Sequence, residues 1–395
     1  MKEKKRAHLV FLKTNLNFDG RVFSLINTLS FAYTNDEIIV YNYDVNVDET
    51  IRLQKNTRII YFKSFFEKFN KFKVFRALRL LEYSINSFFK LIYYRPESIQ
   101  LHHEVTLIAP LLYKFFNRKV TLVYDDKEFY HYKNKNISPF FYFIEKSIIR
   151  WSELLIITNE YRRKAVFKMN KNKIKKHIIV DNFEFKNQFS RKINNILLDK
   201  LNLIKNDNKK ILLHQGVISK ERGAKKLVDV IETLPFDWKL CFIGVSQNDY
   251  EKFEQILKDE LKNKIKNFGY VDYNELSDFY KYVDGAVLFY DVYNFNNKYC
   301  APNRLYSAAN NGVPIIVNED NFTLSTFVRK FKNGVCFSGI DDLKIFFSNY
   351  SYFKKNADIM KNNYEHKEMI PELYKFYKND VLPISYFVWL FLQLQ

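Results

Sequence analysis

Glycine, proline and cysteine are scarce in this 395-residue chain, which contains nine, eight and three of them respectively. With so few glycines, we expect each one where the backbone needs a positive φ or a close approach. The cysteines, Cys241, Cys300 and Cys336, are odd in number and lack metal-ligand spacing. They indicate a reducing compartment with no disulfide framework. No internal repeat is visible either.

Long hydrophobic runs are also missing. Near the N-terminus the apolar run extends only from Ala7 to Leu12 and includes His8, which predicts a first β-strand rather than a signal peptide. Residues 381–394 are mostly apolar, but a spanning helix needs about 20 such residues. We expect this stretch to be either a terminal helix docked on a core or an interfacial anchor.

Positive charge is abundant: 63 Lys and Arg against 44 Asp and Glu give a formal net charge of +19. This balance favours polyanionic partners such as nucleic acid, acidic lipid headgroups or phosphorylated substrates, unless it only reflects lysine usage on a solvated surface. Hydrophobic residues make up 47% of the chain, enough for packed cores, so the chain is not disordered. Its length fits two domains of roughly 170–200 residues each.

Short apolar runs alternate with amphipathic stretches, the pattern of α/β folds with parallel sheets. Polar residues 186–209 interrupt it, so we place a linker at 189–208 between a first domain, 1–188, and a second, 209–370. Residues 371–395 should form C-terminal helices that pack on the first domain or on a membrane surface. Predicted strands are Ala7–Leu12, Glu37–Tyr43, Arg58–Tyr61, Ser98–Leu101, Val120–Tyr124, Leu154–Thr158, His177–Val180, Ile211–His214, Lys239–Ile243, Ile265–Phe268, Gly285–Phe289 and Pro314–Val317. Predicted helices cover Arg21–Phe31, Val105–Phe116 and Pro139–Arg150, and begin near Arg222, Gln247, Tyr273 and Pro302.

Three blocks in the second domain carry a family resemblance. The first, residues 214–223, joins a strand to a helix and has a glycine at its third position and an Arg-Gly pair at its end. The second begins at residues 267–271 and continues to Tyr280, and the third runs from residue 300 to residue 316. In order and spacing, the three resemble the GT-B glycosyltransferases, specifically the large retaining group known as family 4. The resemblance implies two doubly wound, Rossmann-like domains that face a central cleft, with a C-terminal helix crossing back.

The resemblance implies that the second domain binds a nucleotide-sugar. Gly216 would let the backbone approach the diphosphate, and the guanidinium of Arg222 would stabilise charge on the leaving group, unless it points into water at a helix start. Pro302 suits a first helical turn, whose free N–H groups could hold the same diphosphate. The expected donor-binding residues are Gly216, Arg222, Gly269, Pro302, Asn303, Arg304, Leu305 and Ser307. Family members usually carry Glu where this chain has Ser307 and Tyr299.

The first domain resembles the same family over residues 17–21, 102–104 and 123–130. Asp19 would act as a helix cap or as a ligand of a sugar hydroxyl, and either histidine of the second segment could bond the reacting sugar. The resemblance implies the acceptor-side residues Asp19, Arg21, His102, His103, Asp125 and Glu128, and the catalytic residues Arg222, His103, Asp19 and Glu128.

Residues 63–95 contain eight Lys or Arg against two Glu, interleaved with aromatic residues. A basic amphipathic helix of this kind indicates binding to an anionic membrane surface. The same composition could bind nucleic acid by stacking and phosphate contact, or form an ordinary helix with its Phe residues in the core. We prefer the membrane, because acceptors in the resembled family are often lipid-linked.

The resemblance as a whole implies a bacterial glycosyltransferase that is retaining and metal-independent and requires no cofactor. Its substrates would be a nucleotide-sugar donor and a glycan or polyprenyl-linked acceptor in capsule, O-antigen or exopolysaccharide synthesis. We expect it in the cytoplasm, peripheral on the inner face of the cell membrane. The missing Glu at Ser307 motivates an alternative, a catalytically inactive GT-B-like scaffold. A nucleic-acid partner is not expected, because no recognition module accompanies the charge.

Overall fold

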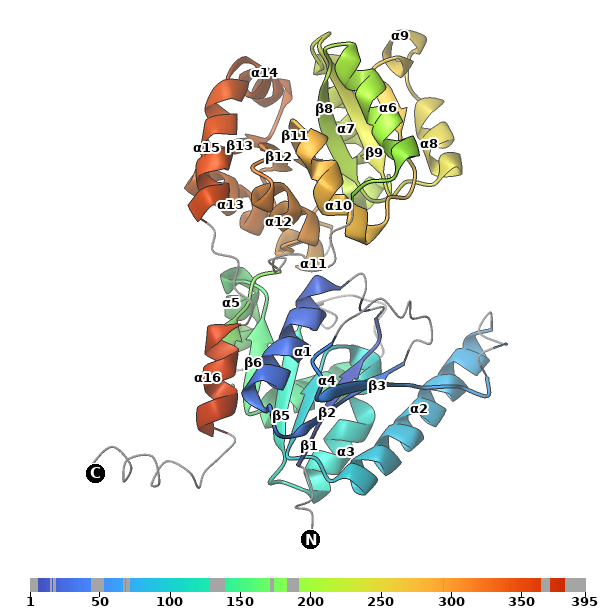
Figure 1. Cartoon of the computed structure of the whole chain (residues 1–395), viewed down its shortest axis with the longest axis vertical. Coiled ribbons are helices and arrows are strands. Elements are labelled where there is room, and N and C mark those ends of the chain that lie inside the picture. Colours follow the sequence, from blue (N-terminus) through green and yellow to red (C-terminus); the bar gives the residue numbers. More distant parts are fainter. Residues whose placement is uncertain are drawn as a thin grey trace, which may run out of the picture. The chain divides into compact units, whose positions relative to one another are not determined.

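The computed structural model describes residues 6–14, 16, 19–43, 53–66, 68, 72–127, 139–170, 174–182, 192–293, 295–363 and 370–380. The chain divides into two compact units, one made of Met1–Asp181 with Lys367–Gln395 and the other of Asn182–His366. Each unit is built on its own parallel sheet (Figure 1). Glu128 and the apolar stretch 381–394 lie outside the described residues.

The sheet of the first unit has seven strands within the described residues, in the order β3-β2-β1-β4-β5-β6-β7. Their bounds are β1 Ala7–Leu12, β2 Glu37–Asn42, β3 Thr57–Tyr61, β4 Ser98–Leu101, β5 Thr121–Asp126, β6 Leu154–Ile157 and β7 His177–Ile179. The helices are α1 Gly20–Ala32, α2 Lys73–Tyr94, α3 Ile108–Phe116, α4 Pro139–Trp151 and α5 Glu160–Met169, with a 3₁₀ turn, η3, at Glu104–Thr106. Strands β1, β4 and β6 are buried along their whole length, as expected of a parallel sheet covered on both faces.

The last described helix, α16 (Pro371–Asp380), belongs to the first unit and packs against α1 (Figure 1). The hydroxyl of Tyr33 donates to the carbonyl oxygen of Tyr377 over 2.9 Å, and the N–H of Ile370 donates to Thr28 Oγ1 over 3.1 Å. The expected return of a C-terminal helix is therefore confirmed.

In the second unit the described strands follow the order β10-β9-β8-β11-β12-β13. They are β8 Lys210–Gln215, β9 Trp238–Ile243, β10 Ile265–Asn267, β11 Gly285–Leu288, β12 Ile315–Asn318 and β13 Gly334–Phe337. The helices are α6 Asn195–Asn206, α7 Ala224–Thr233, α8 Gln247–Glu254, α9 Asp259–Lys262, α10 Tyr273–Phe279, α11 Phe295–Lys298, α12 Asn303–Asn310, α13 Phe322–Phe331, α14 Ile340–Ser348 and α15 Tyr350–Asn363. Two 3₁₀ turns, η4 Lys220–Arg222 and η5 Tyr280–Tyr282, complete the described elements.

Two segments differ from the sequence-based prediction. Most of the linker expected at 189–208 is helix α6, which buries Leu197, Leu201 and Ile204 in the core of the second unit. Strand β13 was not predicted, and Gly334 lets it lie against β12: a Cβ there would lie 1.8 Å from the carbonyl oxygen of Ile315. The second sheet is therefore one strand wider than expected.

Both strand orders are those of doubly wound sheets, in which the winding direction reverses between two central strands. The reversal lies between β1 and β4 in the first unit and between β8 and β11 in the second. Ligands of such sheets bind outside the carboxyl ends of the strands at that point. There, His102 follows β4, Gly216 follows β8, and Tyr290 lies two residues after β11.

Candidate functional site

The three sequence blocks of the second unit meet at Gln215, the last residue of β8. The hydroxyl of Tyr280, from the second block, donates to Gln215 Oε1 over 2.7 Å. Nη1 of Arg304, from the third block, donates to the carbonyl oxygen of Gln215 over 2.6 Å. Blocks that lie far apart in the sequence therefore fix one residue immediately before the predicted glycine turn.

The glycine turn itself is open. Gly216 has φ of +98°, donates its N–H to the carbonyl oxygen of Ile243 over 2.8 Å, and has no heavy atom within 4 Å of where a Cβ would be. Gly244 and Gly269 follow β9 and β10 and also have positive φ. A side chain at Gly216 would be strained by its backbone conformation and would occupy the open space. The backbone is thus accessible at the end of β8, and the contact of Gly216 with a diphosphate stays a prediction.

Arg304 joins the ends of the two central strands of this sheet. Its Nε donates to the hydroxyl of Tyr290 over 3.1 Å and its Nη2 donates to the carbonyl oxygen of Phe289 over 3.1 Å, in addition to the bond to Gln215. The residue is only 6% exposed. These contacts give Arg304 a positioning role, and the phosphate contact expected of it stays a prediction.

Arg222 lies over the same aromatic ring. Its Cζ is 4.1 Å from the ring centroid of Tyr290, and Cζ of Arg304 is 4.4 Å from it. Nη1 of Arg222 is buried and has no hydrogen-bond partner within the described part of the chain. A buried cationic donor without an acceptor costs free energy, which an anionic ligand would recover. Arg222 is therefore not a helix-start side chain that points into water.

Two hydrogen bonds with Asn318 fix the backbone of Tyr290. Asn318 Nδ2 donates to the carbonyl oxygen of Tyr290 and Asn318 Oδ1 accepts from its N–H, both over 2.8 Å. Burial raises the pKa of the Tyr290 phenol, although Arg304 and Arg222 act in the opposite direction. Burial, followed by the charges of the two arginines, lowers the pKa of His214 to about 3. Burial and the two neighbouring guanidinium groups therefore keep His214 neutral at the end of β8.

Helix α12 begins at this point. Pro302 is its N-cap, outside the first turn in which the sequence placed it, and no side chain caps the helix start. The amide of Leu305 bonds to the carbonyl oxygen of Pro302 over 2.9 Å, which leaves the amides of Asn303 and Arg304 at the positive end of the helix. Ser307 is buried one turn further, and its hydroxyl donates to the carbonyl oxygen of Asn303 over 3.3 Å.

The predicted donor-binding residues therefore fall into two groups. Gly216, Arg222 and the start of α12 (Pro302, Asn303 and Arg304) are linked through Gln215 and Tyr290. Leu305 and Ser307 lie inside the unit, and Gly269 follows β10, two strands from β8.

Asp125, at the end of β5, is the centre of a buried network in the first unit. Arg21 Nη2 donates to Asp125 Oδ1 over 2.6 Å and Arg21 Nε donates to Oδ2 over 3.3 Å, while Nη1 donates to the carbonyl oxygen of Val180. His102 Nδ1 lies 3.1 Å from Asp125 Oδ2. Burial alone would raise the pKa of Asp125, but the charge of Arg21 and the hydrogen bond from His102 hold it well below its usual range. Asp125 is therefore an ionised structural anchor.

A directional chain of hydrogen bonds connects this anchor to α16. The hydroxyl of Tyr377 donates to Gln100 Oε1 over 2.5 Å, and Gln100 Nε2 lies 2.7 Å from His102 Nε2. With Gln100 Nε2 as donor, His102 accepts at Nε2 and donates its Nδ1 proton to Asp125, a tautomer that follows from the network. Both ring nitrogens of His102 are therefore engaged in the interior. The sequence did not point to Tyr377 or Gln100.

Asp19 and His103 lie on the same edge of the first sheet. Asp19 caps α1 by accepting from the N–H of Val22 over 3.1 Å, and its other oxygen accepts from Lys127 Nζ. His103 Nδ1 accepts from the N–H of Lys13 over 3.1 Å, so the neutral ring carries its proton on Nε2. Burial, followed by the charge of Lys127, lowers the pKa of His103 well below its usual value. His103 therefore presents an uncharged N–H donor at neutral pH.

Within the described ranges, no three His, Cys, Asp or Glu side chains lie together in a way that could hold a metal ion. In the same ranges, no helix is both long enough and apolar enough to cross a bilayer.

Comparison with known proteins agrees with this geometry. Residues 199–344 match the family model described as "Glycosyl transferases group 1". No curated protein matches the chain significantly in sequence.

Several solved structures match along nearly the whole chain. Sucrose-phosphate synthase from Thermosynechococcus elongatus is 13% identical, with a TM-score of 0.63 over 98% of this chain and 99% of that chain. HepE from Anabaena in complex with UDP-glucose is 12% identical, with a TM-score of 0.65 over 94% and 98%. A glycosyltransferase from Rickettsia africae is 14% identical, with a TM-score of 0.64 over 97% and 100%. The resemblance found in the three blocks is therefore confirmed: this chain has the GT-B fold, and over residues 199–344 it matches the group 1 glycosyl transferases.

Proposed function

We propose that this protein is a glycosyltransferase that moves a sugar from a nucleotide-sugar donor to a glycan or polyprenyl-linked acceptor, with retention of configuration and without a metal ion. The observation that carries the proposal is the buried, unpartnered Nη1 of Arg222, beside the open turn at Gly216. The match of residues 199–344 to the group 1 glycosyl transferases and the UDP-glucose bound to HepE support the class of donor.

The second unit would bind the diphosphate of the donor. The accessible backbone at Gly216 permits close approach, and the uncapped amides of Asn303 and Arg304 add partial positive charge. Arg222 has a planar cation that suits phosphate oxygens. Negative charge grows on the diphosphate as the glycosidic bond breaks, so a pre-placed guanidinium stabilises the transition state more than the ground state.

The first unit would position the sugar and its acceptor. His103 offers a neutral Nε2 donor, which can bond a hydroxyl group without bringing a second positive charge to the reaction. Asp19 has one oxygen on the helix cap and the other on Lys127, so Lys127 would have to release it before it could bind a hydroxyl. Arg21, His102 and Asp125 are occupied with one another and act through positioning.

We place the reaction in the synthesis of a bacterial surface polysaccharide such as capsule, O-antigen or exopolysaccharide, at the cytoplasmic face of the membrane. Polyprenyl-linked acceptors are held at that surface. The net charge of +19 and the exposed cations of the segment 63–95, Lys63, Lys68, Lys73, Arg76 and Arg95, would keep the enzyme near anionic lipids.

The burial of Ser307 supports the alternative of an inactive scaffold. Its hydroxyl bonds to the preceding turn of α12, and no carboxylate stands at this position to hold a ribose or sugar hydroxyl. The two functions differ in one measurable property, because a scaffold has no need to bind a nucleotide.

Titration calorimetry with UDP, GDP and their sugar conjugates, together with assays of nucleotide release, tests the proposal. We expect at least one conjugate to bind, and Arg222→Ala to lower turnover by about 100-fold or more. Arg329→Ala removes an exposed arginine of α13 that pairs with Glu319, and serves as the matched control with unchanged turnover. A chelator should leave the rate of the wild-type protein unchanged.

Two results would contradict the proposal in different ways. If no nucleotide or conjugate binds, the scaffold is the better assignment. If a conjugate binds but Arg222→Ala turns over at nearly the normal rate, Arg222 does not stabilise the leaving group.

A further inference from the structure

A row of apolar residues on α2 faces the solvent instead of the core. Val74, Leu81, Ile85, Phe89 and Ile92 are all exposed, Phe89 by 63%, and their spacing of 7, 4, 4 and 3 residues places them on one side of the helix. The buried positions, which include Arg79, Tyr83 and Ser87, lie on the opposite side. An ordinary surface helix has the reverse arrangement.

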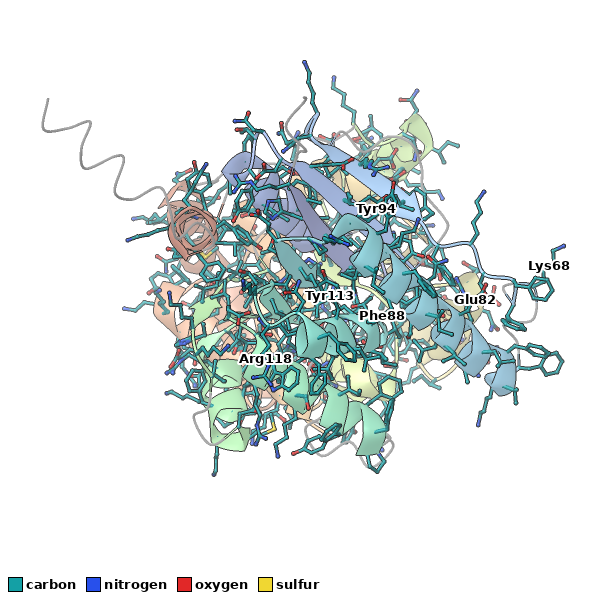
Figure 2. All side chains as sticks on the ribbon, turned by 90° about the horizontal axis from the view of Figure 1, so that it is seen from below. Lys68, Glu82, Phe88, Tyr94, Tyr113 and Arg118 are labelled. Atoms are coloured by element: carbon teal, nitrogen blue, oxygen red, sulfur yellow. The ribbon has the colours of Figure 1, made fainter. Side chains whose placement is uncertain are left out.

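Helices α3 and α4 continue this apolar surface. Helix α3 packs against both α2 and α4, and Figure 2 shows α2 and α3 side by side. On α3, Leu112, Phe115 and Phe116 are exposed, Phe116 by 75%. On α4, Phe140 and Phe143 are exposed. The ring of Phe115 stacks on Trp151 of α4 with 6.0 Å between the ring centroids, so the apolar surface is continuous from α3 to α4.

Cations accompany these side chains while carboxylates are nearly absent. The three helices contain two acidic residues, Glu82 and Glu145, and Glu145 is buried against the hydroxyl of Tyr124 at 2.5 Å. The exposed cations Lys73, Arg76, Arg118, Lys119 and Arg150 form no ion pair with any described residue.

A basic depression of about 320 Å³ lies where α3 and α4 end, lined by Arg118, Arg150, Trp151 and Lys175 among others. Figure 2 labels Arg118 just beyond α3. The one carboxylate in its lining, Glu153, accepts from Lys114 over 3.0 Å and from Lys175 over 2.9 Å. The positive charges of Arg118 and Arg150 are therefore not neutralised by the carboxylate in this depression, and they lie next to exposed aromatic rings.

We propose that this surface of α2, α3 and α4 docks on an anionic lipid bilayer, with lipid phosphates held at Arg118 and Arg150 and the apolar side chains inserted below the headgroups. Exposed Phe, Leu and Ile gain most from an apolar phase, and unpaired cations gain from anionic headgroups. Nucleic acid could bind the cations through its phosphates and stack on the aromatic rings, but it offers no apolar phase for the aliphatic side chains of α2. The inference deepens the proposed function, because it widens the membrane contact from residues 63–95 to three helices.

Flotation of the full chain with phosphatidylcholine vesicles, with and without about 30% phosphatidylglycerol, tests the surface. We expect Ile85→Glu with Phe89→Glu, and separately Phe116→Glu with Phe143→Glu, each to weaken partitioning by at least about tenfold. The matched control, Leu203→Glu with Ile256→Glu, changes exposed residues of the second unit that are 67% and 66% accessible and should have no effect.

The charges are tested separately. Arg118→Gln with Arg150→Gln should weaken binding to anionic vesicles by about fivefold per cation and leave binding to neutral vesicles unchanged. Lys355→Gln with Lys361→Gln on α15 is the control and should bind like the wild-type protein. Unchanged melting temperatures would show that every variant is folded.

Three outcomes would overturn the inference. The first is wild-type partitioning by the α3 and α4 variant, which would confine any contact to α2. The second is an equal loss in the second-unit control. The third is binding to RNA that is tighter than binding to vesicles at the same salt concentration and that is weakened only by Arg118→Gln with Arg150→Gln. Vesicle binding is measured without nucleotide, so a failure of the donor titration would leave this result standing, and the reverse is also true.

Discussion

Asp125→Asn is the most direct test of the buried network in the first unit. The substitution keeps the shape of the side chain and removes its charge, so Arg21 retains a buried guanidinium without an anion. Removing one partner of a buried ion pair costs about 3–5 kcal/mol of stability. The amide oxygen of Asn and the carbonyl oxygen of Val180 can still accept from Arg21, so we expect a loss of about 3 kcal/mol.

The loss should appear in urea unfolding that is monitored by hydrogen exchange. Peptides from β4 and β5 report on the first unit separately from the second. Asp341→Asn, on an exposed ion pair with Lys344, is the control and should change stability by less than about 1 kcal/mol. A loss below about 1 kcal/mol for Asp125→Asn would refute the claim that this carboxylate anchors the strand end.

The pH dependence gives a second check on the same residue. The pKa of Asp125 is lower in the folded chain than in the unfolded chain, where it is about 3.9. The stabilisation is therefore complete above about pH 5 and is lost as the pH falls through the folded-state value. The difference between wild-type and Asp125→Asn should be constant near neutrality and shrink under acid conditions.

Three further changes test other parts of the fold. Gly223→Ala should destabilise the second unit by about 2–4 kcal/mol in thermal unfolding, because φ is +71° and a Cβ would lie 2.5 Å from Phe289 Cβ; a normal melting temperature would contradict this. Below about pH 6.5 stability should fall by about 1.4 kcal/mol per pH unit through His214, whose pKa is about 3 when folded, because the unfolded chain takes up the proton first. His214→Gln should remove that slope in denaturation measured across pH 4–7, and an unchanged slope would assign it to other groups. Tyr377→Phe removes the hydroxyl that donates to Gln100 Oε1 and should lower the free energy of unfolding by about 1–3 kcal/mol. Hydrogen exchange of α16 should accelerate in this variant, and unchanged protection would argue against a stabilising Tyr377–Gln100 bond.

Strand positions could be predicted closely where both faces of the sheet are covered. The predicted runs Ala7–Leu12 and Ser98–Leu101 coincide with the bounds of β1 and β4, which are buried along their whole length. The edge strand β13 is four residues long and begins with Gly334, so its pattern resembles a loop. Helix α6 was hidden by the polar residues on either side of it, although its buried residues have helical spacing. The sequence therefore predicted the central layers better than the edges.

The site could be predicted only where one block of sequence carries it. Gly216 and Arg222 lie in a single turn, so their types and order indicate their chemistry. Tyr290 looks like one more aromatic after a buried strand, and its role depends on two arginines from other segments. The pairing of His102 with Gln100, and through it with Tyr377, exists only after the chain has folded back.

The return of α16 has a consequence for the order in which the protein is made. Residues 7–179 supply all the described strands of the first sheet. Tyr377 and Ile370, which bond to Gln100 of β4 and Thr28 of α1, leave the ribosome only after the described strands of the second sheet. Until then α1 lacks its contact with α16, and a nascent first unit would be a client for chaperones. A gene fragment that ends at residue 181 should therefore yield an incomplete, aggregation-prone product, whereas co-expression with a peptide of residues 367–395 should rescue it.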